Sequence, residues 1–174
     1  MTEWDITTGL AKDHLASNAG VIASLAVSPD AATIALGCEE GTVILIDVGG
    51  GAFSYSRSLE RQPSRVVSLA WHPNGGFLVG GCADSSIRVW EPNHPYGRIV
   101  AQMKVDTLPQ RGERPKKRRR FETLVWDVMV ASDGTIISGD STGSLKIWES
   151  QFWSLKQSFQ VHKADILSLA FDSV

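Results

Sequence analysis

Aspartate, histidine, serine and tryptophan attract attention first in this sequence, because the first three are residue types found in hydrolytic and metal sites. Aspartate, serine and tryptophan occur together in residues 81–91 and again in residues 139–149, each a tight turn followed by a short strand that ends in tryptophan and an acid. A degenerate copy spans residues 37–47 and carries Ile46 in place of the tryptophan. A single active site does not explain residues that recur at matched positions, whereas a hydrogen-bonded repeat scaffold does.

The second candidate for chemistry is a run of basic residues that follows Pro115. Residues 111–120 carry a net charge of +6, so the other 164 residues together carry −8. Such a run is typical of a nuclear-localisation signal recognised by importin, and it would equally neutralise RNA phosphates; a solvated loop tip without a specific role is the third reading. Only Phe121 adjoins it as a stacking residue, which gives base stacking little support. The run consists of Lys116, Lys117, Arg118, Arg119 and Arg120.

The sequence contains no arrangement typical of an enzyme or of a cofactor site. It lacks a Gly-rich phosphate loop, a nucleophile elbow and a pair of suitably spaced carboxylates. His14, His72 and His94 do not stand near other ligands at metal-site spacing. Cys38 and Cys82 are 44 residues apart, at equivalent positions of neighbouring repeats, which favours two small buried residues over a disulfide or a zinc site. We therefore predict no catalytic residue, no cofactor, no metal and no small-molecule substrate.

Two sets of spacings show that the chain is built from repeats. The strand-ending positions at residues 4, 46, 90 and 148 lie 42, 44 and 58 residues apart, and a second set beginning at residues 24, 68, 127 and 168 lies 44, 59 and 41 apart. Both sets place extra residues between Trp90 and Asp127. A period of 40–45 residues with a Trp-Asp-like ending is the WD-repeat signature, in which each repeat forms one four-stranded propeller blade. The predicted fold is all-β: an open fragment of a WD-repeat β-propeller, with about three complete blades and partial blades at both ends.

The repeats divide the chain, and their matched positions predict structural roles. We expect Trp4, Asp84, Trp90, Trp148 and His162 to be structural repeat positions, with Asp84 in a tight turn and His162 matching the histidine of the usual Gly-His pair. The predicted divisions are the end of a preceding repeat (1–20), a repeat (21–60), a second repeat (61–105), a basic insertion loop (106–122), a third repeat (123–161) and the start of another (162–174).

Both predicted ends cut through a blade. Residues 166–171 are expected to open a further blade, and residues 152–161 to form the outer strand of the third repeat. We therefore expect a fragment or a truncated gene model that starts at an internal methionine. Because an open array leaves apolar faces uncovered, we expect residues 1–174 expressed alone to aggregate or associate. Trp153, in that outer strand, and Tyr96, in a Pro-rich connection, are either interface anchors or side chains that cover a neighbouring blade.

The composition is that of an ordinary soluble domain, with 43% hydrophobic and 21% charged residues. No apolar run approaches the ~20 residues of a membrane helix, and the N-terminus lacks the basic and apolar regions of a secretory signal. We therefore expect an intracellular protein without a membrane partner.

The repeat sequences resemble one particular WD-repeat family, the cirhin family. The resemblance rests on residues 2–5 with 8–9, on 80–90 and 97–106, and above all on 123–126, 137–144 and 158–165. It covers nearly the whole chain outside residues 107–122, so the role of the basic run rests on its charge alone.

The resemblance implies a non-catalytic scaffold of the small-subunit processome that acts in pre-ribosomal RNA processing and small-subunit biogenesis. It further implies tandem propellers in the full protein, a nuclear and nucleolar location, other processome proteins as partners, and a direct or indirect contact with pre-ribosomal RNA. The alternative is a generic WD-repeat adaptor, such as a ubiquitin-ligase substrate receptor, that binds peptides on the propeller face. A hydrolase is a distant third.

Overall fold

The computed structural model describes residues 1–50, 52–105 and 122–170, and all of its regular structure is β-strand. In chain order the strands are β1 Thr2–Trp4, β2 Ala11–His14, β3 Ile22–Val27, β4 Thr33–Cys38, β5 Val43–Asp47, β6 Ser54–Ser58, β7 Val66–Trp71, β8 Leu78–Cys82, β9 Ser86–Trp90, β10 Ile99–Lys104, β11 Val125–Val130, β12 Ile136–Asp140, β13 Ser144–Glu149 and β14 Ser154–Gln160.

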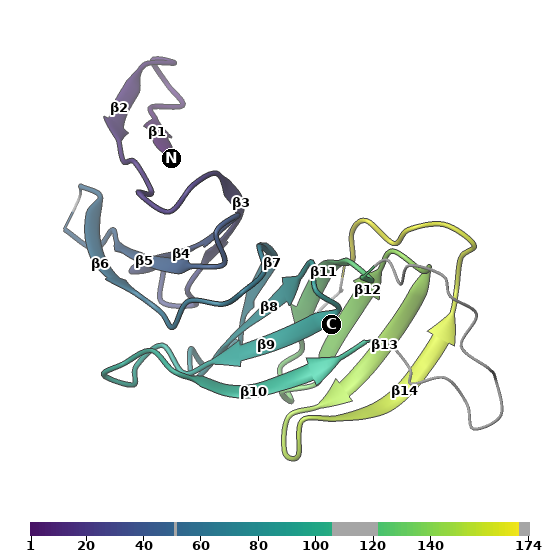
Figure 1. Cartoon of the computed structure of the whole chain (residues 1–174). Helices are drawn as coiled ribbons and strands as arrows, with labels where there is room; N and C mark the ends of the chain where they lie inside the picture. Colours follow the sequence, from purple (N-terminus) through teal and green to yellow (C-terminus); the bar gives the residue numbers. More distant parts are fainter. Residues whose placement is uncertain (51, 106–121, 171–174) are drawn as a thin grey trace, which may run out of the picture.

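In the part of the chain that the structure describes, three four-stranded sheets form the body. We call β3 to β6 the first sheet, β7 to β10 the second and β11 to β14 the third; in each, consecutive strands pair antiparallel. The inner strands β3, β7 and β11 lie next to one another, and the sheets fan out from them (Figure 1). This arrangement confirms the predicted all-β fold of propeller blades.

The turns follow the residue types that close them. Asp30 follows Pro29 in the β3–β4 turn, and its Oδ1 accepts hydrogen bonds from Ser28 Oγ at 2.5 Å and from the Ala32 N–H at 3.1 Å. Gly143, in the β12–β13 turn, has a φ of +78°, and a Cβ there would lie 2.1 Å from the carbonyl oxygen of His162. Glycine is thus required because the chain leaving β14 crosses directly over this turn.

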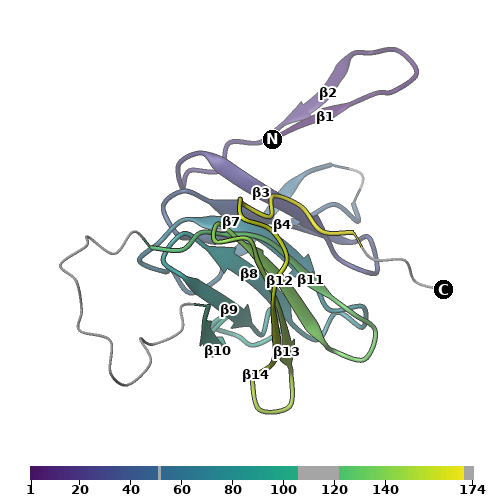
Figure 2. The same ribbon diagram turned by 90° about the vertical axis from the view of Figure 1, so that its right-hand side faces the viewer.

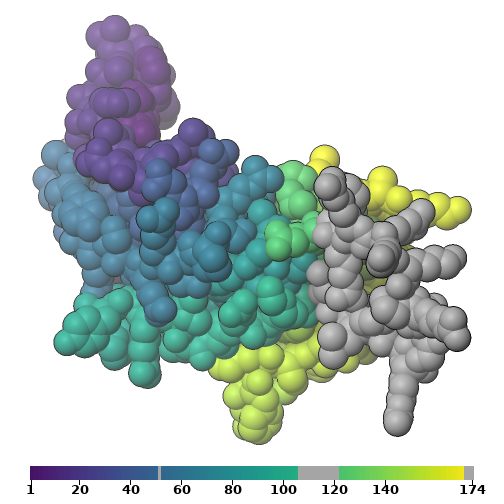
Figure 3. Space-filling model, viewed as in Figure 1, coloured from purple at the N-terminus to yellow at the C-terminus, as the bar shows by residue number. Residues whose placement is uncertain are grey.

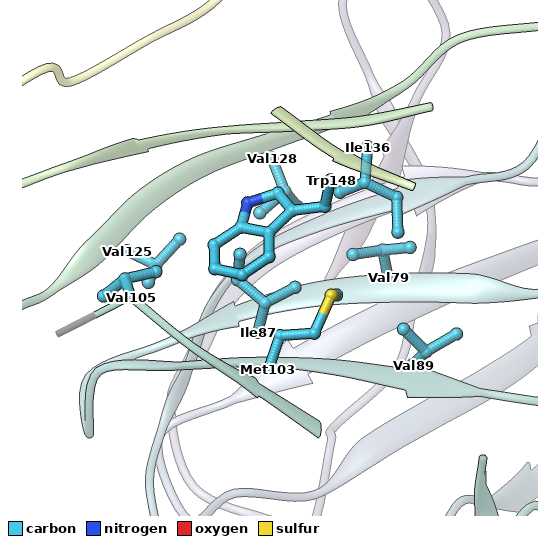
Figure 4. Close-up of a cluster of buried hydrophobic side chains, with 9 residues drawn as sticks. All are labelled: Val79, Ile87, Val89, Met103, Val105, Val125, Val128, Ile136 and Trp148. Atoms are coloured by element: carbon cyan, nitrogen blue, oxygen red, sulfur yellow. The ribbon is translucent and has the colours of Figure 1, made fainter. Parts of the chain in front are cut away.

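Apolar side chains between the sheets form separate cores. The first–second interface is built from both sheets and includes Trp90, and the second–third interface includes Trp148 (Figure 4). Burial of alternate strand residues from two facing sheets is what makes each blade depend on its neighbour. The buried members of the first–second interface are Ala35, Val43, Leu45, Leu59, Val66, Leu78, Cys82 and Trp90; those of the second–third interface are Val79, Ile87, Val89, Met103, Val105, Val125, Val128, Ile136 and Trp148.

The N-terminal hairpin of β1 and β2 projects from the body beside the first sheet (Figures 2 and 3). Met1 and Leu15 pack against a third apolar cluster of the first sheet. Trp4 is 60% exposed, unlike Trp90 and Trp148, because within the described residues β1 pairs with β2 alone and no second neighbouring strand lies under the indole. Leu25 and Val27 of β3 are also exposed on this side.

The C-terminal segment follows the third sheet. Residues 161–170 contain no strand; the predicted opening of a further blade at residues 166–171 stays a prediction, and Phe171 lies outside the described residues. The Ile166 N–H donates to the Asp140 carbonyl oxygen at 3.1 Å, and the Leu169 N–H donates to Asp127 Oδ2 at 2.7 Å. These isolated bonds hold the segment against the third sheet without the continuous ladder that defines a strand. In the described part of the chain no helix is long and apolar enough to cross a membrane.

Candidate functional site

Trp90, the last residue of β9, and Trp148, the last but one of β13, occupy the same repeat position but different environments. Trp148 Nε1 donates a hydrogen bond of 2.9 Å to Ser138 Oγ on β12. Trp90 is fully buried, and its Nε1 has no hydrogen-bond partner within the described residues. The position that matches Ser138 is Gly80, where an added Cβ would lie 2.7 Å from the Trp90 ring. Both tryptophans therefore serve the packing of their blades.

Asp84, in the β8–β9 turn, holds a buried arginine. Its two carboxylate oxygens accept hydrogen bonds of 2.9 and 2.5 Å from the guanidinium of Arg88, whose side chain is 2% exposed. Desolvation raises the pKa of Asp84, but the hydrogen bonds and charge of Arg88 outweigh it and leave the pKa lowered. A lowered pKa means that the pair stabilises the fold above the ordinary aspartate pKa, and that this stability is lost as the pH falls through the folded-state pKa.

The third sheet contains a different buried ion pair, which the sequence pattern did not indicate. Asp140, at the end of β12, is fully buried and accepts a hydrogen bond from Lys146 Nζ of β13, which is also buried. The same carboxylate accepts bonds from the backbone N–H groups of Thr142 at 2.9 Å and Ser144 at 3.3 Å. Buried charges persist when they are paired and hydrogen-bonded in this way.

Aligning the repeats shows that the acid of the pair changes place. Lys146 matches Arg88, but Asp140 matches Cys82, two positions before Asp84. In the first sheet the corresponding residues are Cys38 and Ile44, both buried and apolar. Each blade thus fills the same buried positions in its own way, with an ion pair or with apolar side chains. The acidic and basic residues do not come together in a common site.

The other residue types with possible chemistry are also separate from one another. The His72 ring lies 4.5 Å from the Phe77 ring, while His94 lies 5.8 Å from Tyr96. Burial raises the pKa of the Cys82 thiol to about 11, and Cys38 is also a buried free thiol with a raised pKa. Within residues 1–50, 52–105 and 122–170, no group of three or more His, Cys, Asp or Glu side chains could hold a metal ion.

The remaining predicted positions lie at the surface or outside the described residues. The His162 side chain is exposed, and its backbone N–H donates to the Gly143 carbonyl oxygen at 3.1 Å. The basic run of residues 116–120 lies outside the described residues. On its C-terminal side, the Thr123 N–H donates to Ser85 Oγ of the β8–β9 turn at 2.7 Å, and on its N-terminal side Lys104 Nζ donates to the Asp84 carbonyl oxygen at 2.9 Å.

The two candidate interface aromatics have different surroundings. Trp153 lies in the turn before β14, not in the strand as predicted, with a φ of +55°. Its ring meets Phe77 of the second sheet edge-on at 5.5 Å, so it covers the neighbouring blade. Tyr96 is 82% exposed in the β9–β10 connection.

The sequence is similar to one group of curated proteins over almost its full length. The family model described as "WD domain, G-beta repeat" matches residues 53–91. The chain is 40% identical to the "U3 small nucleolar RNA-associated protein 4" of Saccharomyces cerevisiae, over 99% of the chain and 22% of that protein. It is also 40% identical to the protein of the same name from Schizosaccharomyces pombe, over 97% of the chain and 23% of that protein. The chain thus spans less than a quarter of the length of these relatives.

A solved structure with the same fold is found in the "Crystal Structure of Mitotic Checkpoint Complex". One of its chains superposes with a TM-score of 0.74 over 97% of this chain and 46% of that chain, at 19% identity. At that identity the likeness establishes the fold, and the sheets described above are those of a WD-repeat β-propeller.

Proposed function

We propose that this chain is part of a non-catalytic scaffold for pre-ribosomal RNA processing. The premises are the WD-repeat propeller fold and the relatives named for U3 small nucleolar RNA. The scaffold acts in the small-subunit processome, in the manner implied by the resemblance to the cirhin family. The observation that carries the proposal is the 40% identity to the S. cerevisiae protein over 99% of the chain. The proteins named RACK1 also match, at 25–29% identity over 79–84% of the chain, so the identity to the U3-associated relatives is higher and extends over more of the chain.

The non-catalytic part of the proposal is supported by the surroundings of the reactive residue types. Asp84, Asp140, Arg88 and Lys146 are engaged in ion pairs within single blades. A repeated packing position accounts for these groups without a substrate. The proposed partners are other processome proteins and pre-ribosomal RNA, bound directly or through those proteins, and the proposed location is the nucleolus.

The division of the chain into repeats is part of the same proposal. Residues 21–60, 61–105 and 123–161 each contain one of the three sheets, which supports their assignment as successive repeats. Residues 1–20 then complete a preceding repeat, residues 162–174 begin a following one, and residues 106–122 are an insertion between the second and third.

The experiment that tests this function is affinity purification of the tagged protein after ultraviolet crosslinking in cells. We expect pre-ribosomal spacer RNA, U3 RNA and processome proteins to be recovered, with less RNA at the higher of two salt concentrations if RNA is bound directly through phosphates. Recovery of ubiquitin-ligase subunits without pre-ribosomal RNA would instead identify a generic adaptor and contradict the proposal.

The basic run requires its own test, because importin binding and RNA binding predict different outcomes. Replacing residues 116–120 with glutamine should abolish nuclear accumulation if importin reads the run, and an added heterologous nuclear signal should then restore both location and crosslinked RNA. If the run contacts RNA, the added signal restores only location. In that case the plot of log K, the association constant for RNA, against the logarithm of the salt concentration should become less steep. Its negative slope should decrease in magnitude by about 3.5, since each of five phosphate contacts on a single strand contributes roughly 0.7.

A further inference from the structure

A groove separates the turns of the first and second sheets at one edge of the molecule. It has a volume of about 380 Å³, which is within the usual range of about 300–1,000 Å³ for small-ligand sites. It lies between the β3–β4 turn, the β7–β8 turn and the β9–β10 connection, and we call it the turn groove. Its lining residues are Ser28, Pro29, Asp30, Thr33, Trp71, Pro73, Asn74, Gly75 and Asn93.

The repeat alignment explains why this space is open. The positions of Ser28 and Thr33 in the first sheet match those of His72 and Phe77 in the second. At the second–third interface His72 and Phe77 stack on each other, and Trp153 from the β13–β14 turn closes over Phe77. Two small hydroxyl side chains therefore leave room where the neighbouring interface is filled by aromatic rings.

The turn groove has one charged wall. Among its lining residues Asp30 alone carries a charge, and it is exposed. Hydrogen bonds from Ser28 and from the Ala32 N–H lower the pKa of this carboxyl group, so it is ionised at neutral pH. Both of these bonds go to Oδ1. A ligand can therefore approach Oδ2 without breaking the bonds that hold the turn.

The groove also has a fixed aromatic wall. Trp71 Nε1, on β7, donates a hydrogen bond of 3.1 Å to the Ala26 carbonyl oxygen on β3. This bond holds the half-buried indole across the boundary between the two sheets. The side-chain amides of Asn74 and Asn93 complete the lining with neutral donors and acceptors.

We propose that the turn groove binds the side chain of an arginine in a peptide segment of a partner protein. A guanidinium pairs with a carboxylate in a charge-assisted hydrogen bond, and its flat, weakly hydrated surface packs on an indole. Asp30 and Trp71 supply these two partners in one groove, while the asparagine amides suit the peptide groups that flank the arginine. The proposal is independent of the proposed role in RNA processing, because it concerns a protein ligand and a different surface.

The test is a fluorescence-anisotropy titration of the intact protein that contains this chain against a labelled peptide, acetyl-Gly-Arg-Gly-Ser, and against its citrulline analogue. Citrulline has nearly the shape of arginine but no charge. We expect the citrulline peptide to bind about tenfold more weakly or not at all. Asp30→Asn should weaken the arginine peptide by about the same factor, and Thr33→Phe should abolish its binding by filling the groove as Phe77 fills the next interface.

Matched controls come from the other repeats. Asp30→Asn should fold, because Asn74 holds the same position of the next turn and its Oδ1 accepts the Gly76 N–H at 2.8 Å. Asp133→Asn makes the same charge change in the corresponding turn of the third sheet, away from the groove, and should leave binding unchanged. Equal binding of the two peptides, or equal losses with Asp30→Asn and Asp133→Asn, would overturn the proposal. Circular dichroism establishes that each variant is folded, and if Thr33→Phe is not, the two aspartate variants still decide.

Discussion

The buried Asp140–Lys146 pair can be exchanged for the apolar pair that the first sheet carries at the same positions. The perturbation is a cycle of Lys146→Ile, Asp140→Cys and the double variant, which introduces the residue types of Ile44 and Cys38. In the first sheet those two side chains are buried in contact with an apolar cluster, so the blade geometry accepts them. The cycle therefore tests whether the charges of the third sheet stabilise mainly each other.

The magnitudes follow from burial and from the hydrogen bonds that survive each change. Lys146→Ile leaves a fully buried carboxylate with only neutral donors, at a cost of about 3 kcal/mol. Asp140→Cys leaves a buried ammonium and also removes the bonds from Thr142 and Ser144, at a cost of about 4 kcal/mol. The double variant leaves no buried charge without a partner. It loses only the hydrogen bonds of the turn, at a cost of about 2 kcal/mol in unfolding free energy.

Urea unfolding followed by far-ultraviolet circular dichroism at pH 7 measures the four free energies. We expect the double variant to be more stable than either single variant, by about 1–2 kcal/mol. The reasoning would be refuted if the double variant lost as much unfolding free energy as the two single variants lose together. That result would show that the broken ion pair does not cause the destabilisation.

Three further predictions concern the tryptophan positions and the buried thiol. Trp148→Phe should cost at least about 1 kcal/mol more in unfolding free energy than Trp90→Phe, because only the former leaves the buried Ser138 hydroxyl unpaired; equal costs would show that this bond contributes nothing. Gly80→Ala should cost about 1–3 kcal/mol in urea unfolding because the added methyl group meets the Trp90 ring, and an unchanged midpoint would contradict that contact. Cys82 should resist iodoacetamide at pH 8 in the folded chain, because its pKa is raised to about 11, and should react once the chain unfolds; complete labelling of the folded chain within minutes would contradict its burial.

Most of the fold could be predicted from the sequence because the signals for it are repeated. Each repeat independently shows a strand, a turn containing proline, aspartate or glycine, and a strand-ending hydrophobic residue. The terminal segments were harder, because a strand forms only where a second strand supplies its hydrogen bonds. Residues 166–170 have the alternating pattern of β3 and β7, but in the described residues they make only isolated bonds to the third sheet.

The side-chain partners within a blade could be predicted less well. The motif drew attention to Asp84, and the same motif gives no reason to expect that Asp140 would take over its role two positions earlier. The open groove depends on the volumes of Ser28 and Thr33 compared with His72 and Phe77. These volumes can be compared once the repeats are aligned. The sequence does not show, however, that the two turns face each other across a groove.

The measurement that tests the central proposal most directly is the pattern of ribosomal RNA precursors after rapid depletion of the protein that contains this chain. We predict that unprocessed small-subunit precursors accumulate and mature small-subunit RNA falls, while large-subunit RNA is maintained. Re-expression of the intact protein should restore processing. Unchanged precursor levels after complete depletion would contradict the role as a scaffold for pre-ribosomal RNA processing.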